Sequence, residues 1–206
     1  MVTRRAVGKC LLGGLLTGNL LLDRVWAAGR KIVGKGTRRE SLIHENPAAL
    51  DATQLEITSL GSFGTMGSTD VEVDLSTWRL EVVGRVNQPL KLTYSDLLAL
   101  PALERTVLLI CPGFFANQGR WRGVSLAALL RAADCHRSAG RVSVEGERGR
   151  QASFPMADVL SEKVFLAYQV NGTALPQKHG SPLRVVAEGY YGSEWIKYVN
   201  RISAEA

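Results

Sequence analysis

The chain has 206 residues, which is room for one domain of ordinary size and a short appendage. Hydrophobic residues make up 46% and charged residues 21%, and this globular composition excludes intrinsic disorder and collagen-like repeats. The formal net charge is +6, and no apolar run approaches the roughly 20 residues that a membrane-spanning helix needs.

The first 27 residues have the pattern of an export signal. Arg4, Arg5 and Lys9 precede an apolar stretch over residues 10–22, and a small-residue cleavage site ends at Ala27. The paired arginines resemble a twin-arginine signal, a type that exports folded proteins, often with a cofactor already inserted. We therefore expect residues 1–27 to be a twin-arginine-type signal and the protein to be periplasmic. Cleavage would leave a net charge of +3, which gives a nucleic-acid partner little electrostatic support.

Residues 28–54 follow the signal and are basic at first, then polar. They are interpreted as an extended, solvated arm or linker, with a short helix near residues 47–50. The domain proper is expected to span residues 55–206. Two cysteines remain after the signal, Cys111 and Cys135, so one disulfide is compatible with an oxidising compartment, but two cysteines make no disulfide scaffold.

The domain is predicted to contain many short strands and few helices. Alternating or short apolar runs predict strands over residues 78–83, 90–93, 106–110, 141–145, 164–170, 183–187 and 195–202. Ser95 and Ser125 are expected to cap helices over residues 96–100 and 126–133, and Asn171-Gly172 predicts a tight turn. Residues 112–120 are expected to form a loop. Because strands do not alternate with long helices, the fold class is α+β, a strand-rich mixed or barrel-like sheet.

Cys111 ends the buried strand over residues 106–110 and leads into a glycine-containing loop. Its position points toward a cleft and leaves three roles open. The thiol could be inert and buried, a nucleophile with a nearby base, or a thiolate ligand to a metal in cationic surroundings.

A second group of residues combines His179, Arg184 and Lys197 with glycine turns at strand ends. Cationic and hydrogen-bonding groups beside free backbone N–H groups suit a doubly charged anion such as a phosphate. The alternative is a set of surface positions, with Lys197 on an edge strand and His179 in a turn. No Gly-x-Gly-x-x-Gly follows the first strand, and no phosphate-binding Gly-Lys-Ser/Thr loop is present.

Three stretches carry a family resemblance: Asn171-Gly through Leu183-Arg184, Gly189-Tyr-Tyr-Gly through Ile196-Lys197, and Cys111 ahead of Trp121-Arg-Gly-Val-Ser-Leu126. Together they resemble the molybdopterin-binding domain of the sulfite oxidase family, over residues 55–204. The resemblance implies a molybdenum-molybdopterin (Mo-MPT) cofactor with Cys111 as the molybdenum ligand. The residues that it implies for cofactor binding are Phe63, Thr65, Ser153, His179, Arg184, Trp195, Ile196 and Lys197.

The chain departs from sulfite oxidases where those enzymes bind a doubly charged substrate with arginines. Gly64-Thr-Met-Gly67 replaces one such run, and Phe114-Phe115 stand where another would be. With these replacements, the chain resembles the family's short periplasmic branch, which includes the catalytic subunit of a methionine-sulfoxide reductase. They imply an exported oxidoreductase that transfers an oxygen atom on a small S- or N-oxide.

Two alternatives stay open for this chain, a sulfite dehydrogenase and a catalytically inactive binding subunit of the same fold. The expected electron partner is a membrane haem protein or a cytochrome. The protein is expected to be a monomer without a nucleic-acid partner, and Tyr190 and Tyr191 are candidate proton donors by location alone.

Overall fold

The computed structural model describes residues 29–206. The signal expected over residues 1–27 lies outside the described residues. Between residues 29 and 206, no helix has both the length and the apolar character needed to cross a membrane.

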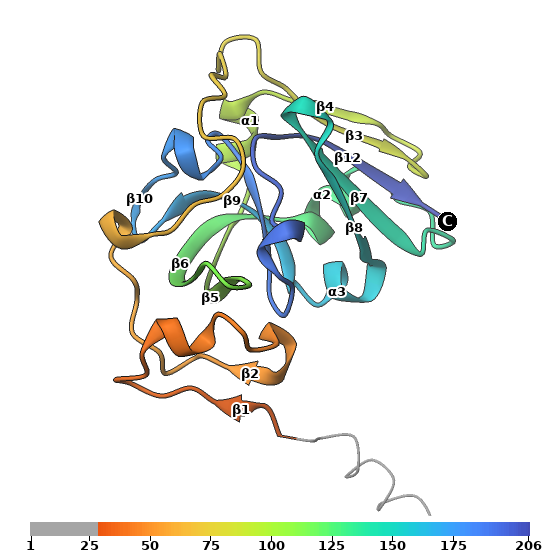
Figure 1. Cartoon of the computed structure of the whole chain (residues 1–206). Coiled ribbons are helices and arrows are strands. Elements are labelled where there is room, and N and C mark those ends of the chain that lie inside the picture. The colour runs from red at the N-terminus through yellow and green to blue at the C-terminus, as the bar shows by residue number, and fades with distance from the viewer. Residues whose placement is uncertain (1–28) are drawn as a thin grey trace, which may run out of the picture.

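Two five-stranded sheets form the body of the protein (Figure 1). The first sheet is antiparallel and consists of β10 (Thr173–Ala174), β9 (Val164–Val170), β6 (Phe115–Ser125) and β5 (Ala102–Cys111) in that order, with β11 (Arg184–Ala187) also paired to β9. The second sheet is mixed and consists of β4 (Leu90–Leu92), β3 (Leu80–Gly84), β12 (Val199–Glu205), β7 (Arg141–Gly146) and β8 (Gln151–Pro155). In it, β12 runs parallel to β3 and antiparallel to β7.

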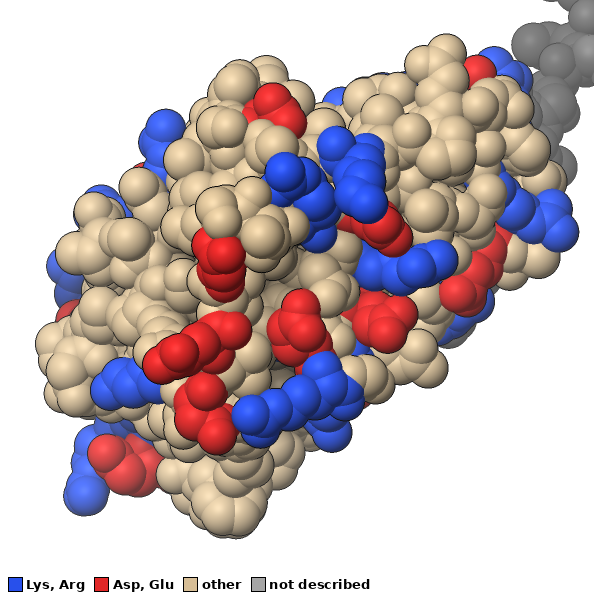
Figure 2. All heavy atoms as spheres, turned by 90° about the horizontal axis from the view of Figure 1, so that it is seen from above, with Lys and Arg blue, Asp and Glu red and all other residues tan. Residues whose placement is uncertain are grey.

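Three short helices complete the main core: α1 (Tyr94–Ala99), α2 (Leu126–Ala132) and α3 (Met156–Leu160). The core joins apolar side chains of both sheets, and its fully buried members include Leu80, Trp121, Phe154, Leu166 and Ile202. The α+β, strand-rich class is confirmed, with the described strands forming open sheets rather than a closed barrel. On the face in Figure 2, Lys and Arg side chains are interspersed with Asp and Glu rather than gathered in one basic patch.

Residues 112–120 are not the loop that their glycine and polar residues predict. Only the turn Pro112–Gly113–Phe114 separates β5 from β6, and Cys111 pairs with Phe115 in a continuous hairpin. The neighbouring polar residues Asn117 and Gln118 of β6 are both buried. The sequence of this strand therefore lacks the alternation of apolar and polar residues that identifies a half-buried strand.

Two further expectations need correction. Helix α1 is capped by Thr93 rather than Ser95, because Thr93 Oγ1 accepts from the Asp96 N–H while the Thr93 N–H donates to the Asp96 carboxylate, a capping box. Residues 195–198 are irregular, follow the 3-10 turn Gly192–Glu194, and precede β12 at Val199. By contrast, Ser125 caps α2 as expected, and Asn171-Gly172 joins β9 to β10.

Residues 29–54 are not the solvated arm that the charge of this segment suggests. Two short parallel strands, β1 (Lys31–Ile32) and β2 (Leu50–Asp51), flank two 3-10 turns, Arg39–Leu42 and Pro47–Ala49. Its apolar side chains form a second core on β5 and β6: Val33, Leu42, Leu50 and Leu55 pack on Leu108, Ile110 and Ala116. Spaced apolar residues among the basic ones therefore suffice to fold this segment against the domain. The described cysteines, Cys111 and Cys135, are both free, so they form no disulfide with each other.

Candidate active site

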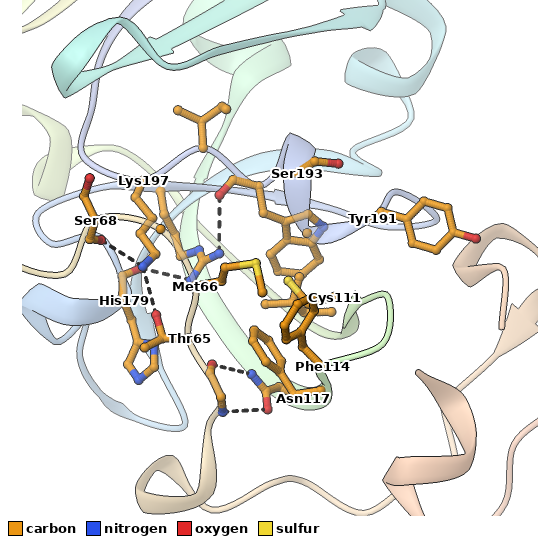
Figure 3. A pocket seen from close by; sticks show the side chains of 18 of the residues that line it. Thr65, Met66, Ser68, Cys111, Phe114, Asn117, His179, Tyr191, Ser193 and Lys197 are labelled. Carbon is orange, nitrogen blue, oxygen red and sulfur yellow. Dashed lines mark hydrogen bonds between the residues drawn. The ribbon is translucent and has the colours of Figure 1, made fainter. Parts of the chain in front are cut away.

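One cavity of about 610 Å³ collects residues from four separate stretches of the chain. They are residues 63–68, residues 109–117 of the β5–β6 hairpin, residues 147–150, and residues 179–198. The cavity is lined by every residue predicted for the site except Ser153: Phe63, Thr65, Cys111, His179, Arg184, Trp195, Ile196 and Lys197. Figure 3 shows Lys197 beside Thr65, Ser68 and His179, with Cys111 and Phe114 in another part of the cavity.

Cys111 reaches the cavity from the last position of β5 and is 8% exposed. Burial raises the pKa of its thiol, and the positive charges of Arg184 and Lys197 act in the opposite direction. Gly192 forms the wall next to the sulfur, since a Cβ at position 192 would lie 2.5 Å from Cys111 Sγ. The thiol therefore lies near two cations, and cationic surroundings favour the thiolate form that binds metals.

Lys197 joins three parts of the cavity wall through its ammonium group. Nζ donates to Thr65 Oγ1 at 2.9 Å, to the Ser68 carbonyl at 3.1 Å and to the Lys178 carbonyl at 2.7 Å. All three acceptors are neutral, and no carboxylate of the described residues pairs with this ammonium. Burial, followed by repulsion from Arg184, lowers the pKa of Lys197 to about 8. An anion bound near Nζ would favour the charged form of Lys197 and so raise its pKa again.

Arg184 is a buried cation that also lacks an anionic partner among the described residues. Its Nη1 donates to the His179 carbonyl at 2.9 Å, and its guanidinium carbon lies 5.1 Å and 5.5 Å from the ring centroids of Trp121 and Trp195. Burial lowers the pKa of Arg184 to about 10, so the group is still charged at neutral pH. Its positive charge is thus fixed in position in the cavity wall.

His179 adds a nitrogen without a partner to these two charges. The side chain is 1% exposed, and its Nε2 has no hydrogen-bond partner among residues 29–206. Burial, followed by the charges of Arg184, Lys178 and Lys197, lowers the pKa of His179 to about 4, so the ring is neutral at pH 7. A buried ring nitrogen without a partner usually indicates a ligand or water that completes the site.

The residues present fit a molybdopterin that bears a phosphate and a thiolate-ligated metal. Two cations without anionic partners, Arg184 and Lys197, match the negative charge of such a cofactor. The free Nε2 of His179 can form a hydrogen bond with a nitrogen or oxygen atom of the pterin. The side chain of Cys111, which lines the cavity, can supply the soft sulfur ligand of the metal. The predicted ligand roles are therefore consistent with the geometry and stay predictions for each residue.

Ser153 is the predicted site residue that lies outside this cavity. It is part of β8, where its hydroxyl accepts a hydrogen bond from Arg141 Nε at 3.0 Å. It lines an adjoining groove that shares Arg150 and Ser193 with the main cavity. The sequence placed it by resemblance, but strand pairing between β7 and β8 turns it toward Arg141.

Several cavity residues were not predicted. Asn117 holds the first loop, since its amide donates to the Gly64 carbonyl at 3.0 Å and accepts from the Gly64 N–H at 3.2 Å. Arg150 brings a third cation to the cavity. Phe114, by contrast, was expected near the substrate, and it is 70% exposed in the cavity wall. A charged residue in a turn carries no periodic signal that could have identified Arg150.

The two tyrosines differ in position. Tyr191 lines the cavity, whereas the Tyr190 hydroxyl donates to Asp158 at 2.5 Å and does not line the cavity. Burial, with the Asp158 hydrogen bond, raises the pKa of Tyr190 to about 12. Although Tyr191 is among the lining residues, Figure 3 shows its ring pointing away from Cys111 and Lys197, and the residue packs against the second core, so the structure favours neither tyrosine as a proton donor.

Comparison with known proteins agrees with this geometry. The "Uncharacterized oxidoreductase YuiH" of Bacillus subtilis is 32% identical over 142 residues, which cover 66% of this chain and 72% of that protein. Mitochondrial sulfite oxidase of Rattus norvegicus is 31% identical over 198 residues, 81% of this chain. The solved sulfane dehydrogenase SoxCD of Paracoccus pantotrophus shares the fold, with a TM-score of 0.63 and 23% identity, over 97% of this chain and 56% of the other.

The chain spans 34% of the length of the rat sulfite oxidase, so only part of that protein has a counterpart here. Residues 66–206 match the family described as "Oxidoreductase molybdopterin binding domain", which is more than half of the chain. The match includes Cys111, His179, Arg184 and Lys197, and it begins after Phe63 and Thr65. The chain therefore belongs to the oxidoreductase molybdopterin-binding domain family, whose members bind a molybdopterin cofactor and catalyse redox reactions.

Proposed function

We propose that this oxidoreductase removes the oxygen atom from a small, neutral S- or N-oxide. The observation that carries the proposal is the apolar character of the cavity wall around Cys111. Phe114, Phe115, Leu109 and Met66 line the cavity, and Phe114 and Met66 are 70% and 44% exposed. A doubly charged substrate beside such side chains would lose its water of hydration and gain no charged or hydrogen-bonding partner. This loss would cost on the order of several kcal/mol.

The arginines that follow the hairpin turn do not compensate for this wall. Arg120 points to Glu104, with Nε 3.8 Å from its carboxylate, and neither Arg120 nor Arg122 lines the cavity. Lys197 and Arg184 hold fixed positions among backbone carbonyls, where they suit the cofactor's negative charge. This division of the cavity into a cationic part and an aromatic part favours a neutral substrate.

When bound, the cofactor supplies a two-electron centre that can accept an oxygen atom. Cys111 would ligate its metal, and His179, Arg184 and Lys197 would hold its pterin and phosphate. Phe114 and Phe115 would exclude water and orient the organic part of the substrate. Over a complete turnover, the S- or N-oxide, two electrons and two protons give the reduced substrate and water.

The electrons would come from a membrane haem protein or a cytochrome, and the reaction would take place in the periplasm. The support for this location is the pattern of residues 1–27, with paired arginines ahead of a short apolar run. The cofactor class agrees with it, because a twin-arginine route exports proteins that have folded around a cofactor.

Sulfite oxidation is the second candidate, and Arg150 is the observation that favours it. This exposed arginine lines the cavity, and no ion pair holds it within residues 29–206. The identity with rat sulfite oxidase points the same way. A catalytically inactive binding subunit is less well supported, since Cys111 and the three cofactor-facing residues all reach one cavity.

The test uses the full chain, purified from a host that makes the cofactor. Molybdenum and the fluorescent pterin product should both be present at about one per chain, which excludes an inactive apoprotein. Oxidation of a reduced viologen dye is then followed with sulfoxides and N-oxides, and reduction of ferricyanide is followed with sulfite. Turnover with the oxides supports the proposal, whereas turnover with sulfite alone overturns it in favour of the second candidate.

A further inference from the structure

The hairpin that carries Cys111 has two faces, and the segment of residues 30–58 covers the one that faces away from the cavity. Side chains alternate along β5, so Leu109 and Cys111 line the cavity while Leu108 and Ile110 point to the opposite side. There they pack against Leu42 and its apolar neighbours of the segment. Without residues 30–58, this face of the hairpin would be open to water.

Hydrogen bonds hold the segment to the turn and to the second strand of the hairpin. The Gly113 N–H, at the turn two residues after Cys111, donates to the Ile43 carbonyl at 3.0 Å. On β6, the buried Gln118 donates through Nε2 to the Ala52 carbonyl at 2.7 Å and through its N–H to Thr58 Oγ1 at 2.9 Å. The position of the turn thus depends on backbone groups of the segment.

The segment also contacts Glu188 and Tyr191, which precede the glycine that lies beside the Cys111 sulfur. Arg30 Nη1 pairs with Glu188 at 2.9 Å, and Arg105 of β5 pairs with the same carboxylate at 2.5 Å. Tyr191 packs against the segment's core, and it forms a bridge with Ile110. The following residue is Gly192, whose backbone approaches Cys111 Sγ closely.

We infer that residues 30–58 position the molybdenum-ligating cysteine. They contact both stretches that determine where Sγ lies, the β5–β6 turn and the turn over Glu188–Gly192, without lining the cavity themselves. The family match begins only at residue 66, so this role belongs to a part of the chain outside the matched domain. The inference concerns the geometry at Cys111 and is independent of which substrate is reduced.

The test compares two equally conservative truncations of buried leucines in the full chain. Leu42→Ala removes a side chain of the segment, and Leu97→Ala removes one from α1 in the main core; the two leucines are 2% and 0% exposed. In cofactor-free protein, alkylation of Cys111 is measured by peptide mass spectrometry, with Cys135 as the internal reference. In loaded protein, the Mo(V) electron paramagnetic resonance signal is recorded.

Leu42→Ala should raise the ratio of Cys111 to Cys135 alkylation by about threefold or more and alter the Mo(V) signal. Leu97→Ala should lower Tm to a similar degree but leave both readouts as in the wild type. An unchanged ratio in Leu42→Ala, or an equal rise in both variants, would overturn the inference. Should Leu42→Ala give no soluble protein, Arg30→Gln decides by the same ratio, because it removes the segment's ion pair with Glu188 and leaves the pair between Arg105 and Glu188 in place.

Discussion

Lys197 and Thr65 are 132 positions apart in the chain, yet Lys197 Nζ donates a 2.9 Å hydrogen bond to Thr65 Oγ1. The bond connects the loop after Phe63 to the last turn before β12 and closes one side of the cavity. The same ammonium also bonds the carbonyls of Ser68 and Lys178. One charged side chain therefore organises three separate stretches around the site where the cofactor's negative charge is expected.

Replacing Lys197 should weaken cofactor retention. Lys197→Ala removes a charge-assisted contact worth about 1.5–3 kcal/mol, so bound cofactor should be lost roughly ten- to a hundredfold more easily. Molybdenum and pterin per chain after gel filtration measure this effect. Lys178→Ala is the matched control, since it removes a nearby exposed charge and keeps the backbone carbonyl that Lys197 uses. Full occupancy in Lys197→Ala would contradict the role assigned to the ammonium.

Replacing the cysteine should separate cofactor binding from turnover. Cys111→Ser removes the soft thiolate ligand but leaves His179, Arg184 and Lys197 in place, so the fold and much of the pterin should remain while activity disappears. Pterin content and dye-coupled turnover are the two measurements. Cys135→Ser, at the half-buried second cysteine, should behave as the wild type. Residual turnover in Cys111→Ser above that of heat-treated protein would refute the assignment.

Adding a methyl group beside the sulfur should displace it. A Cβ at position 192 would lie 2.5 Å from Cys111 Sγ, which is closer than real Cβ atoms come to other atoms, so the sulfur or the backbone at position 192 must shift. Gly192→Ala should therefore lower molybdenum content and turnover while the chain stays folded by circular dichroism. Gly61→Ala, where a Cβ meets nothing within 4 Å, is the control and should retain both. Normal activity in Gly192→Ala would show that the sulfur has more freedom than the geometry allows.

Acid should destabilise the cofactor-free protein through His179. The pKa of this ring is about 4 in the folded chain and 6.5 in its ordinary state, so the unfolded chain binds more protons between these values. Stability from this group is present above pH 6.5 and is lost as pH falls toward 4, by about 2 kcal/mol between pH 7.5 and pH 5.

Urea unfolding at the two pH values measures this loss for the wild type and for His179→Gln. The variant keeps a polar side chain that does not titrate in this range. Its free energy of unfolding should therefore fall by about 2 kcal/mol less than that of the wild type between pH 7.5 and pH 5. Equal pH dependence in both proteins would mean that another group is responsible.

Introducing a cation at the wall should shift substrate preference. Phe114 is 70% exposed, so Phe114→Arg should fold normally and place a guanidinium at the aromatic part of the cavity. We expect about a tenfold gain in kcat/KM for sulfite relative to a neutral sulfoxide, which corresponds to one added charge-assisted contact of roughly 1.4 kcal/mol. Phe114→Leu, which keeps the wall apolar, should leave the ratio near that of the wild type. A ratio that moves equally in both variants would count against the proposed neutral substrate.

The local sequence determined several parts of the molecule correctly. The apolar runs of β9 and β5 identify strands, because they are short, rich in β-branched and aromatic residues, and bounded by turn residues. Ser125 identifies the start of α2, and Asn171-Gly172 identifies a hairpin, since both depend on contacts within a few residues. The family motifs around Cys111 and His179 pointed to the cofactor in the same way, through residue types at short spacing.

Tertiary contacts decided the rest. Residues 115–120 form a strand because β5 pairs with them, and the apolar residues of segment 30–58 pack on the domain because Leu108 and Ile110 offer them an apolar face. Ser153 points to Arg141, and Arg150 lines the cavity, through the pairing of β7 with β8. The sequence by itself determined which side chains could hold an anion and a metal, since this follows from their chemistry. Which of them share one cavity depends on contacts between segments more than a hundred positions apart, and such contacts leave no local periodicity in the chain.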